Sequence, residues 1–414
     1  MVKAENVMFW LLVIPLFLVC TIPFNYLPQA TFTLFTVKWP IHHLIFTSTG
    51  LVLLITTLTV CARNRFLPVY FLFALAVWAS MLLSSVFSPA NRPEALQTSA
   101  GFLLRAMAPS LAAYLLVRYA KREAKLQMAL IVVVTIAAAI AIYEPLTGTY
   151  LIERYYVHGF GTEVWPPSYG YAVGAIGQPL PLSIFLTILF PFTVASWGKI
   201  NKTTYVLINC LVIGTVIMTF RRTGYLFLLL GAGLVLWNST LPKKKMLLWG
   251  GIISLVLAFF VAIIPESREK MRRFSPSIAV DEFANKHRGK AYQVSYRMFT
   301  DHPLLGIGTR QYFHRYKEYA DYPLPDNSPD SQYLRFLAEG GALGLSTFLL
   351  FMGYVLKRVW THAKKPEGAP YLASLTALAL GFVVNDSLYW PAIQMTAFVI
   401  IGMAMGRIDR EVSA

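Results

Sequence analysis

The sequence predicts an all-α integral membrane protein with about twelve transmembrane helices and one large loop between the ninth and tenth helices. Composition is the first reason: 56% of the 414 residues are hydrophobic and only 14% are charged, whereas a soluble domain carries about 25% charged residues. The second is that apolar runs close to the length of a membrane span recur along the chain. The third is that basic residues alternate between the short loops that separate these runs.

The predicted spans are mostly apolar runs long enough to cross the hydrocarbon core of a bilayer. The chain therefore divides into residues 1–264 with helices one to nine, the loop 265–339, and residues 340–414 with helices ten to twelve. The spans cover roughly residues 7–24, 43–61, 67–87, 99–117, 127–144, 179–197, 203–220, 223–239, 246–264, 340–356, 369–386 and 389–406.

The distribution of lysine and arginine predicts the orientation, because these residues concentrate in the short cytoplasmic loops of membrane proteins. One set of alternate loops contains little basic charge beyond Lys38, Arg92 and Arg154. The other set is expected to be cytoplasmic, together with both termini. It contains Lys3, Arg63, Arg65, Arg118, Lys121, Arg122, Lys125, Lys199, Lys202, Lys243, Lys244, Lys245, Lys357, Arg358, Lys364, Lys365, Arg407 and Arg410.

Two long loops then lie on the outer side. The loop 145–178 is rich in aromatic residues, glycine and proline. The loop 265–339 is basic, which does not contradict an external position because long translocated segments escape the charge rule. We expect two short amphipathic helices in this second loop, at about residues 285–300 and 329–339.

Several classes of function and site are not expected. The net charge of +16 does not indicate nucleic-acid binding, because no basic soluble domain accompanies it. The cysteines, Cys20, Cys61 and Cys210, are odd in number and match no metal-ligand spacing, so neither a disulfide framework nor a zinc site is expected. No carboxylate cluster suits Mg²⁺. The sequence therefore predicts no metal and no cofactor.

Adjacent arginines interrupt the long apolar run "VIMTFRRTGYLFLLL". Arg221 and Arg222 fall in the tight outer turn between the seventh and eighth predicted helices, where snorkelling lowers the free energy of placing a charge in the membrane. Two interpretations stand at this point: the pair anchors the turn at the interface, or it serves a functional site.

Three sequence elements lie on the outer side in a fixed order: "FRRTG" at 220–224, "HRGKAYQVSYRMFTDHPLLGIG" at 287–308, and "PDSQYLRFLAEGGALG" at 329–344. Together they resemble the O-antigen ligase and polymerase superfamily of bacterial envelope enzymes. The positions that match the family pattern are Arg222 in the first element, Arg288, Tyr292 and the "HPLLGIG" turn in the second, and Asp330, Tyr333, Leu334, Glu339, Gly341 and Gly344 in the third.

The resemblance implies a metal-independent glycosyltransferase of the bacterial inner membrane with a periplasmic active site. Its expected partners are an undecaprenyl-diphosphate-linked oligosaccharide as donor, a glycan or glycolipid acceptor, and the lipid bilayer, with no nucleic acid. Asp330 stands where the ligase branch carries a histidine. This difference favours a polysaccharide polymerase, with an O-antigen ligase that joins O-antigen to lipid A-core as the alternative.

The resemblance also implies roles for individual residues. Arg222 and Arg288 are expected to stabilise the diphosphate leaving group, since a guanidinium is always charged and forks onto phosphate oxygens. Asp330 is expected to take the proton of the acceptor hydroxyl, although Asp330 alone also suits a helix N-cap. The residues expected to bind substrate are Arg221, Tyr292, Tyr333 and Arg105, and the next candidates for the base are Glu339 and Asp326.

A twelve-helix transporter or flippase is the alternative from another class, because length, helix count and charge suit it equally. Its polar residues are expected near the bilayer midplane, whereas here they gather in the predicted outer loops. Arg105, inside a predicted span, is the main residue that supports this alternative.

Overall fold

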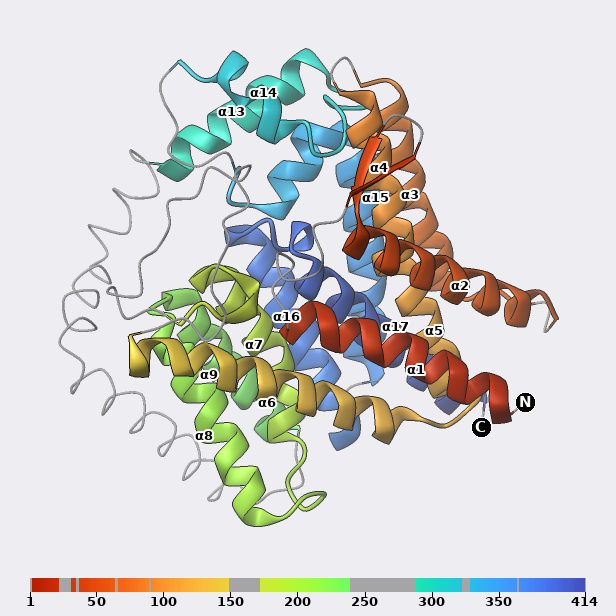
Figure 1. The fold of residues 1–414 in the computed structure, drawn as a ribbon, viewed down its shortest axis with the longest axis vertical. Coiled ribbons are helices and arrows are strands. Elements are labelled where there is room, and N and C mark those ends of the chain that lie inside the picture. Colours follow the sequence, from red (N-terminus) through yellow and green to blue (C-terminus); the bar gives the residue numbers. More distant parts are fainter. Residues whose placement is uncertain are drawn as a thin grey trace.

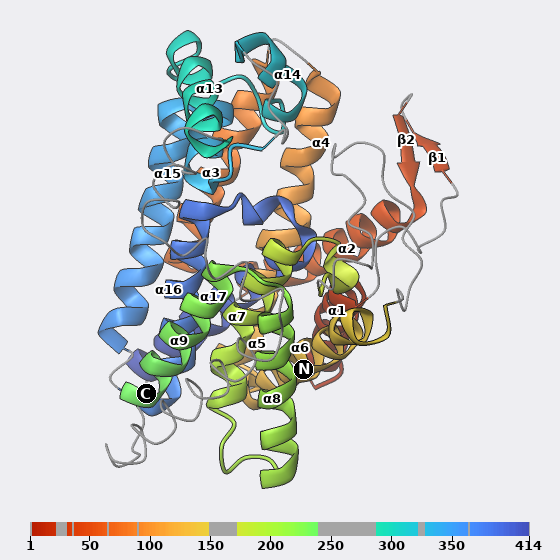
Figure 2. The same ribbon diagram turned by 90° about the vertical axis from the view of Figure 1, so that its left-hand side faces the viewer.

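The computed structural model describes residues 2–21, 31–34, 37–63, 66–88, 91–148, 172–238, 287–321, 328–362 and 365–413. Figures 1 and 2 show a bundle of helices with α13 and α14 at one end. We call this the α13 end and the other the opposite end. The elements are α1 (Val2–Thr21), β1 (Thr31–Leu34), β2 (Val37–Pro40), α2 (Ile41–Arg63), α3 (Val69–Val86), α4 (Arg92–Phe102), the π-helical turn η2 (Leu103–Met107), α5 (Ala108–Arg118), α6 (Glu123–Thr147), η4 (Gly174–Ile176), α7 (Pro179–Val194), α8 (Lys202–Met218), α9 (Arg222–Trp237), α13 (His287–Asp301), α14 (Tyr312–Tyr319), α15 (Gln332–His362), η5 (Pro366–Gly368), α16 (Ala369–Val384), η6 (Ser387–Tyr389) and α17 (Pro391–Ser413).

The helical class is confirmed, and each predicted span within the described residues falls on a helix. The predicted span 246–264 lies outside these residues. Five further apolar helices have 10–17 residues, so the count of twelve spans stays a prediction. Six helical segments are long and apolar enough to cross a membrane: Val69–Val86, Arg92–Arg118, Glu123–Thr147, Gln332–His362, Pro366–Val384 and Pro391–Ser413.

The centre of the bundle is formed by helices that are apolar on every side. Nearly every residue of α7 is buried, as is nearly every residue of α17 up to Gly406. A helix that is hydrophobic on all sides is typically buried in this way. The surrounding helices expose apolar side chains, such as Leu207 of α8 at 64% and Leu226 of α9 at 61%. This outer surface suits contact with lipid.

Small residues allow α17 to pack closely on α5. Gly402 and Gly406 lie one turn apart on α17 and face the backbone of Ser110 and Tyr114; a Cβ at Gly406 would lie 2.6 Å from the Tyr114 carbonyl oxygen. Small residues four positions apart commonly allow the backbones of two transmembrane helices to come into close contact. The sequence "GMAMG" therefore fixes this pair at the centre of the fold.

The structure contains two elements that were not predicted from the sequence. An antiparallel hairpin pairs β1 with β2, with Thr31 opposite Pro40, so the protein is not wholly helical. Helix α14 forms in a part of the loop where no helix was expected from the sequence. It packs by the face that carries Tyr312 and Tyr316, which are one turn apart and buried. Both elements are too short to show a clear period in the sequence.

Helix α15 combines two predicted elements. We expected a short helix at 329–339 followed by a span at 340–356, and the structure joins them across a kink at Gly341, where φ is 62° and ψ is −160°. Residues other than glycine rarely adopt this conformation. The kink separates the first turns of α15, which belong to the α13 end, from its membrane-length portion.

Ion pairs join the helices at the opposite end. The Glu123 carboxylate of α6 accepts hydrogen bonds from Arg407 at 2.8 Å and Arg410 at 2.7 Å, both on α17. Asp409 pairs with Arg358 of α15 at 2.6 Å. These contacts hold the C-terminal helix against α6 and α15.

Candidate functional site at the α13 end

Arg288 and Asp330, which belong to different sequence elements, meet at the α13 end. The Arg288 Nε atom lies 3.7 Å from the Asp330 Oδ2 atom, and the two side chains are 32% and 24% exposed. Asp330 has a φ of 49°, a conformation that aspartate adopts more readily than most residues. Both side chains of the pair therefore remain partly accessible to solvent.

The Ser331 side chain makes an N-cap contact at the start of α15. Helix α15 begins at Gln332, and the Ser331 Oγ atom accepts a hydrogen bond from the Leu334 N–H at 3.5 Å while donating to the Phe382 carbonyl at 3.2 Å. A side-chain oxygen directly before the helix is the usual N-cap arrangement. The preceding residue, Asp330, lies beside Arg288.

Packing of α13 places Tyr292 next to this pair. The face of α13 formed by Ala291, Val294 and Met298 is buried, and it packs against the cluster that includes Ile307 of the following loop. Burial raises the pKa of Tyr292, and the positive charge of Arg288 opposes that shift. Tyr292 therefore remains a protonated hydroxyl beside the ion pair.

Two glycines let the "HPLLGIG" turn pack on the kink of α15. Gly306 has a φ of 67°, and a Cβ there would lie 2.5 Å from the Glu339 carbonyl oxygen. A Cβ at Gly341 would lie 2.5 Å from the backbone of Leu304. Only glycine allows two backbones to come this close. The second and third sequence elements are thus one packed unit.

The Glu339 side chain holds the loop that leads into α14. Its carboxylate accepts hydrogen bonds from the Arg310 N–H at 2.8 Å and the Tyr312 N–H at 3.2 Å, and a third from the Tyr389 hydroxyl. These three donors occupy both oxygens of a side chain that is 4% exposed. Glu339 therefore has a structural role, which disfavours it as the catalytic base. Asp326, the other alternative base, lies outside the described residues.

A buried ion pair that sequence reasoning missed ties α15 to the segment between α16 and α17. Arg335 Nη2 lies 2.7 Å from Asp386 Oδ2, with side chains 7% and 10% exposed, and the guanidinium lies 3.9 Å from the centre of the Tyr389 ring. The only sequence signal was the polar pair "ND" at 385–386 between two apolar runs. Gln332 adds a contact from its side-chain oxygen to the Leu388 N–H at 3.0 Å.

The turn that carries Arg221 and Arg222 lies at the start of α9, near the same end of α16. A Cβ at Gly381 of α16 would lie 3.6 Å from the Phe227 ring of α9, and the next residue, Phe382, accepts the hydrogen bond from Ser331. Helix α9, which begins at Arg222, and the residue after Asp330 therefore contact neighbouring positions near the end of α16. Convergence of Arg222 and Arg288 on a single cavity stays a prediction.

Two predicted substrate-binding residues have other surroundings. The Tyr333 hydroxyl donates to the Ala379 carbonyl at 3.0 Å, and its ring packs against Phe348 and Phe382, which favours a role in joining α15 to α16. Arg105 lies in the π-helical turn η2, and its Nε donates to the Gly101 carbonyl at 3.3 Å. Irregular turns of this kind often occur at functional sites.

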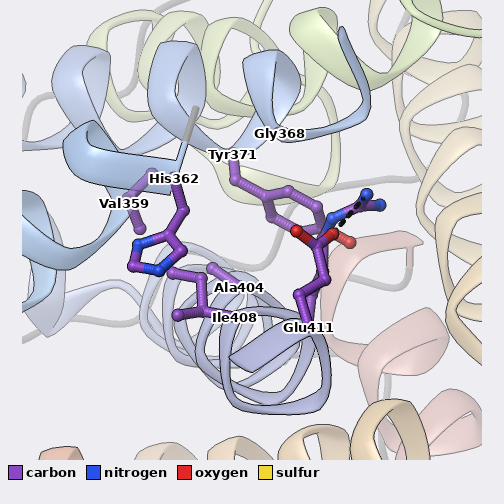
Figure 3. A pocket seen from close by; sticks show the side chains of 8 residues that line it. Val359, His362, Gly368, Tyr371, Ala404, Ile408 and Glu411 are labelled. Atoms are coloured by element: carbon purple, nitrogen blue, oxygen red, sulfur yellow. Dashed lines mark ion pairs between the residues drawn. The ribbon is translucent and has the colours of Figure 1, made fainter. Parts of the chain in front are cut away.

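A small pocket lies at the opposite end, away from the predicted site residues. Arg407 and Glu411 in its wall form an ion pair, 2.7 Å apart, and Figure 3 shows Glu411 in the wall with His362 and Tyr371. The pocket lies between α15, α16 and α17 and is lined by Val359, His362, Gly368, Tyr371, Ala404, Arg407, Ile408 and Glu411.

Across the described parts of the chain, no group of three or more His, Cys, Asp or Glu side chains is placed to hold a metal ion.

Comparison with known proteins bears on the α13 end. No curated protein matches the chain. A family model described as O-antigen ligase matches residues 207–349. The matched segment contains the arginine turn, the Arg288–Asp330 pair and Glu339, and it ends before α16. This match supports the assignment of the protein to the O-antigen ligase and polymerase superfamily.

Proposed function

We propose that the protein is a membrane glycosyltransferase that transfers or polymerises glycan units from an undecaprenyl-diphosphate carrier onto an acceptor hydroxyl. The observation that carries this proposal is the accessible pair of Arg288 and Asp330, 3.7 Å apart, within the segment that matches the family. The protein resides in the bacterial inner membrane as a multi-pass protein with cytoplasmic termini, and the α13 end faces the periplasm.

In the proposed reaction, Asp330 accepts the proton of the acceptor hydroxyl as its oxygen attacks the anomeric carbon of the donor sugar. The bond between that carbon and the diphosphate oxygen breaks, and undecaprenyl diphosphate leaves. Negative charge grows on the leaving group, and preoriented cations stabilise such charge best. Arg222 and Arg288 supply these cations, so that no metal is needed.

The remaining predicted residues act in binding. Arg221, next to Arg222, offers a second contact to the diphosphate. Tyr292 is a protonated hydroxyl beside Arg288 and Asp330, which suits a hydrogen bond to a sugar. Arg105 contacts the lipid-linked part of the donor from within the membrane. Tyr333 supports the site by packing, since its hydroxyl already bonds Ala379.

A polysaccharide polymerase is favoured over an O-antigen ligase because an aspartate occupies position 330. The transporter alternative is disfavoured because the polar contacts of the matched segment gather at the α13 end, and the pair of Arg288 and Asp330 is partly exposed there.

The deciding experiment is an assay of the purified protein with undecaprenyl-diphosphate oligosaccharide in the presence of EDTA. A polymerase lengthens the glycan on the carrier, whereas a ligase moves it to an added lipid A-core acceptor. A protein that moves the carrier between leaflets of a vesicle without forming a glycosidic bond would contradict the proposal.

A further inference from the structure

The buried carboxylate of Glu144 lies in the last turns of α6, outside the matched segment. Glu144 is 3% exposed, and α6 ends at Thr147. A negative charge near a helix C-terminus is unfavourable because the helix dipole is negative there, and burial adds to that disadvantage. Such a residue calls for strong specific contacts.

Those contacts are backbone N–H groups of the segment that enters α7. The Glu144 Oε2 atom accepts hydrogen bonds from Val173 N at 3.2 Å and Gly174 N at 3.0 Å. Gly174 has a φ of 54°, and a Cβ there would lie 2.8 Å from the Ala141 side chain. The segment beginning at Ala172 is therefore pressed against α6 and held there by one carboxylate oxygen.

The same segment holds the end of α8. The Ala172 N–H donates to the carbonyl of Met218, the last residue of α8, at 2.9 Å. Two residues later, Phe220 has a φ of 50°, a strained conformation for a bulky side chain that persists only where neighbouring contacts hold it. Arg221 and Arg222 follow at once. The contacts run from Glu144 through Ala172 to the arginine turn.

We propose that Glu144 is a positioning residue for Arg221 and Arg222, fixing the turn from which both guanidinium groups reach a diphosphate. This inference rests on the proposed function, in which these arginines bind the lipid-linked donor. Removal of the acceptor leaves two buried N–H groups without a partner. The segment at 172–174 then loosens, and the strained turn relaxes away from its binding geometry.

Two substitutions separate positioning from bulk stability. Glu144→Leu removes the acceptor, whereas Glu144→Gln retains an amide oxygen that can accept both N–H groups. The matched control is Glu123→Leu, which removes a buried carboxylate at the other end of the same helix, where it bonds Arg407 and Arg410. Both leucine variants are expected to lower the melting temperature.

The test measures the KM for undecaprenyl-diphosphate oligosaccharide and inhibition by undecaprenyl diphosphate. We expect Glu144→Leu to raise the donor KM and the inhibition constant of undecaprenyl diphosphate by roughly tenfold. This change corresponds to about 1.4 kcal/mol for the lost contacts. Glu144→Gln should restore both to within about twofold, and Glu123→Leu should leave both unchanged. An unaltered donor KM in Glu144→Leu, or equal loss in Glu144→Gln, would overturn the inference.

Hydrogen–deuterium exchange of the unliganded protein gives a readout that does not depend on activity. Glu144→Leu should speed exchange at residues 172–174 and also at 219–225, while Glu123→Leu should not affect 219–225. Absence of glycan transfer by the wild-type protein would refute the proposed function alone. Unchanged exchange at 219–225 in Glu144→Leu would refute the positioning role, whatever the activity.

Discussion

Arg335 and Asp386 form a buried ion pair, 2.7 Å between Nη2 and Oδ2, that joins the first turns of α15 to the connection between α16 and α17. Asp330, the proposed base, lies little more than one helical turn before Arg335. The pair therefore links the α16–α17 connection to the element that carries the proposed chemistry.

Asp386→Ala should reduce the free energy of unfolding by about 3–5 kcal/mol, because it leaves the Arg335 guanidinium buried without its partner. Reversible unfolding in detergent, followed by circular dichroism, measures this loss. The matched control is Asp321→Ala, which breaks an exposed pair with Arg297 whose side chains are 46% and 69% exposed. Exposed pairs contribute little, so equal effects in the two variants would show that Arg335 is not held by Asp386.

Asp330→Asn should fold normally and lose about two or more decades of transfer rate, in line with the contribution of general-base catalysis. Asparagine also tolerates the left-handed conformation of this position, and the partly exposed pair with Arg288 adds little stability. Initial rates with excess acceptor measure the effect. Asp330→His should retain part of the activity, because a neutral imidazole also accepts a proton. Full activity of Asp330→Asn would remove it as the base.

Arg222→Lys and Arg288→Lys should each lose most of the activity, since an ammonium group does not replace the planar fork of a guanidinium on a diphosphate. The control for the second variant is Arg297→Lys on the same helix, where Arg297 pairs with exposed Asp321. Single-turnover rates at matched protein levels measure the outcome. Normal turnover in both lysine variants would leave the mechanism without its phosphate-binding groups.

Glu339→Gln should lower the free energy of unfolding by about 1–3 kcal/mol, because one buried donor loses its acceptor. The carboxylate accepts from Arg310 N, Tyr312 N and the Tyr389 hydroxyl, and an amide has only one oxygen to offer them. Thermal unfolding of this variant is compared with Glu318→Gln, an exposed glutamate in the same region. If both variants melt at the same temperature as the wild type, the hydrogen bonds accepted by Glu339 do not contribute to stability.

The two predicted faces can be tested by labelling. In a variant without the native cysteines, Lys244→Cys and Glu318→Cys should react with an impermeant maleimide from opposite sides of the membrane. The reason is the alternation of basic residues between loops. Whole cells and inverted vesicles give the two sides. Labelling of both positions in intact cells would refute the orientation.

The sequence by itself predicted most of the helices and the segment in which the candidate site lies. Long apolar runs predict spans because each backbone polar group in a bilayer must be bonded within its own helix. The "HPLLGIG" and "EGGALG" elements were found from the order of their residues, and their glycines Gly306 and Gly341 lie where two backbones approach closely. Both signals are local, so the order of residues was enough to find them.

Only the tertiary structure decided which distant residues meet. Arg335 and Asp386 lie in separate elements, as do Glu144 and Gly174, and no period or motif relates their positions in sequence. A side chain's partner depends on how α15, α16 and the entry of α7 pack, and that packing is set by contacts along whole helices rather than by neighbours in the chain. The same reason applies at the start of α15: Asp330 and Ser331 are both suitable N-cap residues, and only the structure shows that the helix begins at Gln332, with Ser331 directly before it and Asp330 beside Arg288.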